Sequence, residues 1–255
     1  PEQRLAFRAE LIDRIRNTPG VDDVAEMDTY PLTGGGRGNN VWVEGRTAES
    51  QVGSSFNRVG VDYLKTLQIP LGAGRSFATT DSINAPPVAI INQTLAQKLN
   101  DANLVGKRIV VEAAPGGPET FFEIIGIARD AKFEDLREEE LPVVYLASAQ
   151  DQYPSLSRRY LVRSNLPPAE LSASIKRNLM QFNSGLDVNF QVFRTMVQES
   201  LLRERLMAQL SGFFGILALV LASCGGEAKL VAPAIRMPTP HSKSAALRSG
   251  TADRP

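Results

Sequence analysis

Apolar residues recur at helical spacing near both ends of the first 182 positions. Residues 5–16 and 168–182 each carry their apolar side chains on one arc, which is the pattern of an amphipathic helix. Thr18-Pro19-Gly20 ends the first helix, and Pro167-Pro168 opens the second. The apolar positions are Leu5, Phe7, Leu11, Ile12 and Ile15 in the first helix and Leu171, Ile175, Leu179 and Phe182 in the second.

Runs of β-branched and aromatic residues between the two helices predict strands. A shorter helix is expected at 62–67, and Asn92 is well placed as the N-cap of another that carries Leu95, Ala96 and Leu99. Because strands and helices are interspersed, the sequence predicts the α+β class. The expected strands are 21–27, 41–43, 52–59, 88–91, 109–112, 121–128, 143–146, 160–162 and 188–193.

From Thr195 the helical pattern continues without a breaker into an apolar run at 206–226 that carries no charged residue. At about 1.5 Å per residue this run makes a helix of roughly 30 Å, which matches the hydrocarbon core of a bilayer. A buried core helix is the alternative. We prefer a membrane span because the run is apolar on every side, and because Gly212 and Gly215, with Ser211 close by, suit close approach of a second membrane helix.

Composition excludes little and favours no charged ligand. The chain has 28 basic and 28 acidic residues, so nothing points to nucleic acid or to an anionic substrate. Cys224 is the only cysteine and His241 the only histidine, which excludes an intrachain disulfide and a His/Cys metal cluster. The chain starts at Pro1 with no signal segment, and we expect the protein to continue upstream.

Two glycine-rich segments are candidates for phosphate loops. The run at 34–38 and the segment 72–75 both lack the following helix that such a loop needs, so a flexible loop and a turn are the better interpretations.

Other side chains could carry chemistry, but each has a simpler structural role. Carboxylates that could act as acids or bases occur in any globular protein, the run 137–140 fits a solvated turn, and Trp42 and Phe56 fit core packing better than a ligand surface. The sequence therefore predicts no catalytic, cofactor-binding or metal site, and no enzyme. The carboxylates weighed were Asp81, Asp130, Glu134 and Asp135.

Three segments resemble the periplasmic core domain of MacB/FtsX-like ABC transporter permeases, most closely the large duplicated permeases of Acidobacteria. They are GVDYLKTLQIPLGAGRSFATTDSINAPPVAIINQTLAQKL (60–99), LVGKRI (104–109) and FEIIGIARDAKFEDLREEELPVVYLASAQ (122–150). The stretch FRTMVQESLLRERLMAQLSGFFGILALVLA (193–222) resembles the junction of that domain with the next membrane helix. The resemblance implies mixed sheets with flanking helices in two subdomains over 1–200, followed by a membrane helix at 201–226.

The chain departs from the family pattern after Cys224. Members continue with an apolar stretch and further spans, whereas residues 227–255 form a polar segment rich in Pro, Ser and Ala. We expect this tail to be disordered or the product of a frameshift. Its basic residues would place it in the cytoplasm and the large domain outside, by the positive-inside tendency.

The resemblance implies a non-catalytic permease component of an ABC-type efflux or mechanotransmission transporter in the bacterial inner membrane, with residues 1–200 on the periplasmic side. Its implied partners are an ABC ATPase subunit or domain, a second permease half as a homo- or pseudo-dimer, a periplasmic adaptor and the lipid bilayer, with no cofactor and no nucleic acid. The helix 168–182 and the helix 195–222 are the expected mechanical link.

Three alternatives stay open at this point. The chain could be a membrane-anchored extracytoplasmic binding or sensing domain without transport. It could be a hydrolase, although no constellation of residues supports that. The product could also be nonfunctional, since a lone helix cannot form a transport unit.

Overall fold

A computed structural model describes residues 2–32, 37–46, 50–112, 119–133, 140–155 and 157–224, and it leaves the side chains of 37, 197–208 and 222–224 undescribed. The chain divides into two compact units, Pro1–Leu201 and Leu202–Pro255, each described here by itself. The helices are α1 (Glu2–Arg16), α2 (Tyr63–Thr66), α3 (Gln93–Leu99), the 3-10 turn η2 (Ser148–Gln150), α4 (Pro168–Phe182) and α5 (Phe193–Cys224). The strands are β1 (Asp23–Met27), β2 (Arg37–Val43), β3 (Val52–Val59), β4 (Leu71–Gly74), β5 (Val88–Asn92), β6 (Arg108–Glu112), β7 (Glu119–Ala128), β8 (Val143–Ala147) and β9 (Arg159–Arg163).

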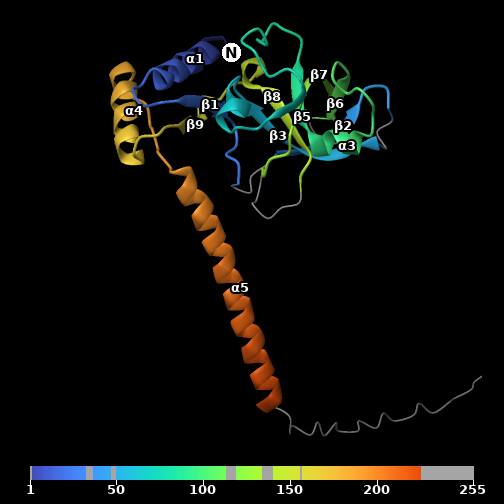
Figure 1. Cartoon of the computed structure of the whole chain (residues 1–255), viewed down its shortest axis with the longest axis vertical. Helices are drawn as coiled ribbons and strands as arrows, with labels where there is room; N and C mark the ends of the chain where they lie inside the picture. Colours follow the sequence, from blue (N-terminus) through green and yellow to red (C-terminus); the bar gives the residue numbers. More distant parts are fainter. Residues whose placement is uncertain are drawn as a thin grey trace, which may run out of the picture. The chain divides into compact units, whose positions relative to one another are not determined.

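Six strands of the first unit close into a ring. Within the described chain the strand order is β2-β6-β7-β5-β8-β3-β1-β9, with β4 paired to β7, and β2 also pairs with β3. The path that starts at β2 runs through β6, β7, β5 and β8 and ends at β3. Because β3 pairs in turn with β2, these six strands form a closed ring without an open edge. Strands β1 and β9 continue outward from β3, with β9 at the end of the sheet (Figure 1).

Side chains alternate across the ring wall, as the period of two in a strand requires. In β8, Val144 and Leu146 pack in one cluster, while Val143 and Tyr145 pack in another. The first cluster receives apolar side chains from all six ring strands and from α3, so we identify it as the ring interior. Because both faces of β5 and β8 are buried, these strands are apolar at nearly every position.

Helices α1 and α4 form a separate layer with β1 and β9, which we call the outer layer. Its own cluster includes Leu11 and Ile15 from α1, Val24 from β1, and Ile175 and Leu179 from α4. The rings of Phe7 and Phe182 stack with centroids 5.8 Å apart. The apolar arcs predicted for both helices therefore face each other.

The described strands form one continuous mixed sheet, with parallel and antiparallel pairs, where the family resemblance implied more than one sheet. The reason is β3, which pairs with β2 over residues 52–56 and with β8 over residues 55–59. Its last residue, Val59, also pairs with Met27 of β1. Backbone hydrogen bonds from Asp28 to Arg58 and from Gly60 to Glu26 flank this pair, so β1 joins the ring over a short stretch. The outer layer and the ring thus differ in their cores although they share one sheet.

The strand predicted at 188–193 is wrong in this structure. Residues 183–192 form no strand or helix, and α5 begins at Phe193. The alternation of apolar and polar residues is present, but no neighbouring strand pairs with it.

Helix α5 covers most of the predicted membrane segment. The side chains described in its second half, from Gln209 to Leu221, are all exposed, and the two adjacent phenylalanines Phe213 and Phe214 are 62% and 60% exposed. Among the residues that the structure describes, no helix combines the length and the apolar character that crossing a membrane requires. Gly225, Gly226 and the tail 227–255 lie outside the described residues.

Candidate functional site

The two glycine-rich segments have different outcomes. Residues 34–36 lie outside the described residues, whereas 71–74 form strand β4 on the edge of β7. Gly74 has a φ of +75°, and a Cβ there would lie 2.2 Å from the carbonyl oxygen of Ile125. Gly74 is therefore required for close contact between two strands, and no helix follows it to bind an anion.

The described carboxylates that were weighed as acids or bases are engaged in structural contacts. Asp81 binds the guanidinium of Arg75 through both oxygens, each at 2.8 Å, and accepts a hydrogen bond from the Ala78 N–H. The Arg75 hydrogen bonds hold the pKa of Asp81 below its usual value. Asp130 accepts hydrogen bonds from the Asn92 side chain and from the Thr94 N–H. Neither carboxylate faces an open site.

The remaining candidates lie in the core or outside the description. Trp42 is buried, and Phe56 packs against the cluster in the ring interior, so neither lines a ligand surface. Glu134, Asp135 and most of the run 137–140 lie outside the described residues, as does His241.

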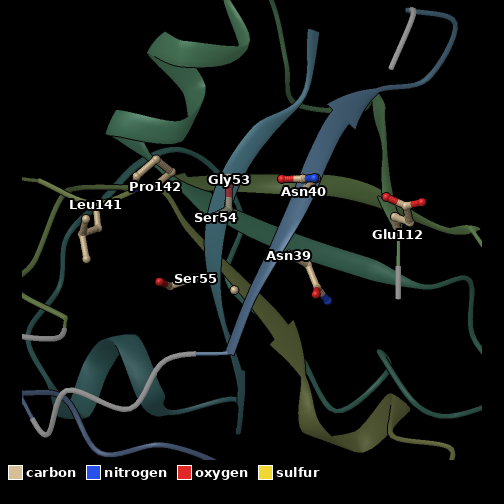
Figure 2. A pocket seen from close by; sticks show the side chains of 9 residues that line it. Asn39, Asn40, Gly53, Ser54, Ser55, Glu112, Leu141 and Pro142 are labelled. Atoms are coloured by element: carbon tan, nitrogen blue, oxygen red, sulfur yellow. The ribbon is translucent and has the colours of Figure 1, made fainter. Parts of the chain in front are cut away.

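A small polar pocket of about 320 Å³ lies where β2 and β3 pair (Figure 2). Asn39, Asn40 and Ser55 bring amide and hydroxyl groups to it, with Leu141 and Pro142 on the other side. Among the described lining residues, Glu112 is the one with an ionisable side chain. The pocket can hydrogen-bond a small polar molecule, but its described lining offers no nucleophile with an adjacent base.

A network of charged side chains is buried between the outer layer and the ring. Glu26 of β1 contacts Arg8 of α1, and its other oxygen accepts a hydrogen bond from Ser148 at 3.2 Å. Arg158 lies 3.2 Å from Glu26 through Nε, donates to Asp151 at 2.7 Å and contacts Asp28. The side chains of Arg8, Glu26 and Arg158 are only 3–4% exposed. Each buried charge therefore needs the opposite charge beside it to offset the cost of desolvation.

Burial changes the protonation behaviour around this network. Two causes lower the pKa of Arg158: desolvation is the larger, and the positive charge of Arg8 is the second. Desolvation, with Glu26 as a second cause, raises the pKa of Tyr160 to about 12. The Tyr160 hydroxyl is buried and has no hydrogen-bond partner among the described residues.

An apolar groove of about 710 Å³ lies beside the same tyrosine, and we call it the α4 groove. Its walls are α1, α4, the strand β9 and the segment that follows α4. Arg158 of the buried network and Tyr160 also line it. Phe190 and Val192 line it and are 43% and 42% exposed. The groove can receive an extended apolar segment, and the alternation at 188–193 was the only signal of it in the sequence.

Comparison with known proteins gives one family and a set of solved structures. The model of the MacB-like periplasmic core domain matches residues 2–181. No curated protein matches the chain.

Two similar solved structures are a periplasmic region and an extracellular domain. The periplasmic region of MacB from Actinobacillus actinomycetemcomitans has a TM-score of 0.49 and 13% identity, over 69% of this chain and 74% of that one. The extracellular domain of the noncanonic ABC-type transporter YknZ from Gram-positive bacteria has a TM-score of 0.47 and 18% identity, over 70% of this chain and 84% of that one.

Proposed function

The chain belongs to the family of MacB-like periplasmic core domains, and from that premise we propose that it is a non-catalytic permease component of an ABC-type efflux transporter. In this proposal a separate ATPase hydrolyses ATP, and the motion reaches the extracytoplasmic domain through helices, as in mechanotransmission. The family match over residues 2–181 is the observation that carries the proposal.

Membrane anchoring by the second half of α5 is part of the proposal. The run 206–226 has no charged residue, and its large apolar side chains are exposed where they are described, including Ile216 at 66% and Leu219 at 73%. Exposed apolar surface of this kind needs a partner or a lipid environment. We propose the bacterial inner membrane as that environment, with residues 1–200 on the periplasmic side.

A charge placed in the apolar run tests the anchoring. Ile216→Arg should lower the fraction of the full chain that stays in membranes after alkaline carbonate extraction, because arginine at a span centre costs about 2.5–3.5 kcal/mol. Gln209→Arg, nearer the end of the run, is the matched control and should be retained. Equal retention of both variants would contradict a membrane span.

Helix continuity tests the mechanical role. We expect an ABC ATPase subunit to co-purify with the full chain, and ATP to change hydrogen exchange in residues 2–201. The double variant Arg203→Gly/Glu204→Pro breaks α5 and should abolish that ATP-dependent change while ATP hydrolysis stays measurable. The control, Arg203→Ala/Glu204→Ala, keeps the helix and should preserve the change. An ATP-dependent change that survives the Gly-Pro break would refute the coupling.

A membrane-anchored binding or sensing domain is the second candidate, and the α4 groove is the observation that favours it. A sensor does not need an ATPase subunit. Purification from native membranes without any ATPase, together with normal membrane retention, would favour this candidate over transport. A second permease half and a periplasmic adaptor are further partners that the transport proposal expects in the same purification.

A further inference from the structure

The polar pocket lies where β2 and β3 pair, and strand register places part of its lining on the outer face of the ring (Figure 2). Val41 and Val111 lie opposite each other and pack in the ring interior. Because side chains alternate along a strand, Asn40 and Glu112, each one position away, belong to the outer face. Gly53 lies opposite Asn40 and shares that face. An amide and a carboxylate on neighbouring strands therefore lie beside a position that has no side chain.

Two glycines keep the pocket open. Gly53 lies opposite Asn40, and Gly38 lies opposite Ser55. A Cβ at Gly53 would have the Asn40 Oδ1 as its nearest contact, and one at Gly38 the Ser54 carbonyl oxygen, each at 3.9 Å. Neither glycine has a positive φ, and the β2–β3 pairs follow one register, so neither a left-handed backbone nor a bulge requires them. Glycine inside a strand costs stability and often marks a place where a ligand comes close to the backbone.

The pocket has a polar side and an apolar side (Figure 2). Asn39 and Asn40 supply amides, which donate and accept hydrogen bonds, and Ser55 supplies a hydroxyl. Leu141 and Pro142 form the other side, and the Ser55 N–H donates to the Pro142 carbonyl at 2.8 Å, which holds that side against β3. A sugar with a short acyl group matches both sides, because its hydroxyls donate and accept and its acyl methyl is apolar.

Charge and size narrow the class of ligand. Among the described lining residues, Glu112 is the one with an ionisable side chain, and it is acidic. The described lining therefore offers no basic group to a phosphate or a carboxylate. A volume of about 320 Å³ is at the lower end of the range for small-molecule pockets and suits one pyranose with a substituent.

From the open glycines and the two-sided lining we propose that this pocket binds a neutral N-acylated amino sugar, a single pyranose of the N-acetylhexosamine class. The pyranose lies over Gly53 and Gly38, its hydroxyls hydrogen-bond with Asn40 and Ser55, and the acetyl methyl contacts Leu141. The inference rests on the ring of strands, and it stands whether or not the chain takes part in transport.

Titration of the full chain in lipid nanodiscs with N-acetylglucosamine and with N-acetylgalactosamine tests the proposal. Trp42, two positions after Asn40 in β2, is the only tryptophan of the chain, so its fluorescence reports on this part of the ring. Saturation-transfer difference NMR gives a readout that does not depend on tryptophan. At least one of the two sugars should bind with a dissociation constant of about 0.1–10 mM, as expected for a ligand of this size. Glucosamine, which lacks the acetyl group and carries a positive charge, should bind at least tenfold more weakly.

Variants of the lining locate the binding. Gly53→Val places methyl groups in the pocket and should weaken binding at least tenfold, while the thermal midpoint stays equal or rises because valine favours strands. Asn40→Ala and Ser55→Ala each remove a hydrogen-bonding group and should weaken binding at least threefold. Ser76→Ala, at an exposed position outside the pocket, is the matched control for the serine and should bind like the wild type.

Three results would overturn the proposal. The first is the absence of saturable binding of both N-acetyl sugars in the expected range. The second is tighter binding of glucosamine, which would mean that the ligand is selected by charge. The third is wild-type affinity in both Asn40→Ala and Ser55→Ala, which would place the sugar elsewhere on the protein. If Gly53→Val fails to fold, these two variants still decide the outcome.

Discussion

At the scale of single residues, Glu26 shows how charges from distant parts of the chain depend on one another. Its carboxylate is 4% exposed and is compensated by Arg8, by Arg158 and by the Ser148 hydroxyl. Buried ion pairs are not strong stabilisers in total, because desolvation offsets much of the attraction. Removal of one partner is costly, because it leaves the other charge buried without compensation.

Glu26→Gln should therefore destabilise the protein far more than an ordinary surface change. We expect a loss of about 3–5 kcal/mol in the free energy of unfolding, measured by urea denaturation followed by far-UV circular dichroism. Glu44→Gln is the control, since Glu44 pairs with Arg108 at 2.5 Å but both side chains are well exposed, and it should cost less than about 1 kcal/mol. Similar losses for both variants would show that the buried network is not coupled as described.

Asp81 gives a prediction about pH. Its folded pKa is lowered by Arg75, so its contribution to stability is present above its ordinary pKa and disappears as the pH falls through the folded pKa. Asp81→Asn should cost about 1–2 kcal/mol at pH 7, and this difference from wild type should shrink below about pH 4. Urea denaturation of both proteins at pH 7, 5 and 3 measures it. A difference that does not change with pH would contradict the ion pair.

At the scale of elements, the start of α3 shows what local sequence can predict. Asn92 was expected to cap this helix, and its side chain does accept a hydrogen bond from the Leu95 N–H at 3.1 Å. The same amide also accepts from the Val143 N–H and donates to the Leu141 carbonyl. The cap could be predicted from the residue spacing. The contacts of Asn92 with β8 and with the loop before β8 could not, because they form only when the whole sheet folds.

Asn92→Ala should remove the cap and leave the Val143 N–H without its acceptor. We expect a loss of about 2–4 kcal/mol in the free energy of unfolding, from the cap and from one or more unsatisfied buried groups. Gln93→Ala, at the exposed next position, is the control and should change stability by less than about 0.5 kcal/mol. If Asn92→Ala behaved like the control, the links to β8 would carry no energy.

Strand prediction succeeded or failed according to how many partners a segment found. The apolar runs of β5 and β8 are buried on both sides and were predicted from their residues alone. Residues 72–75 were predicted as a turn, yet pairing with β7 makes 71–74 a strand. Residues 188–193 have the right alternation and form no strand. Pairing with a neighbour, rather than local propensity, decides both cases.

At the scale of the whole molecule, the α+β class followed from the order of the predicted elements, but ring closure did not. Closure depends on pairings such as Val41 with Val111, which join residues about 70 positions apart. No local pattern encodes them. The α4 groove could not be predicted for the same reason. Its walls come from α1, β9 and the residues after α4, which are far apart in the sequence and are brought together by folding. The membrane span and the tail stay predictions from sequence.

The outer layer joins the first and the last parts of the chain's first unit, and that arrangement has a consequence during synthesis. Asn178 of α4 donates a hydrogen bond to the Arg14 carbonyl of α1, 164 positions earlier. At ribosomal speeds of about 5–20 residues per second, α1 waits on the order of 10–30 s for α4. Throughout that time the side chains of α1 that pack on α4, and the edge of β1 that pairs with β9, lack their native partners. The outer layer can therefore be completed only after α4 has been made, and until then the apolar side chains of α1 that pack on α4 are exposed to aggregation.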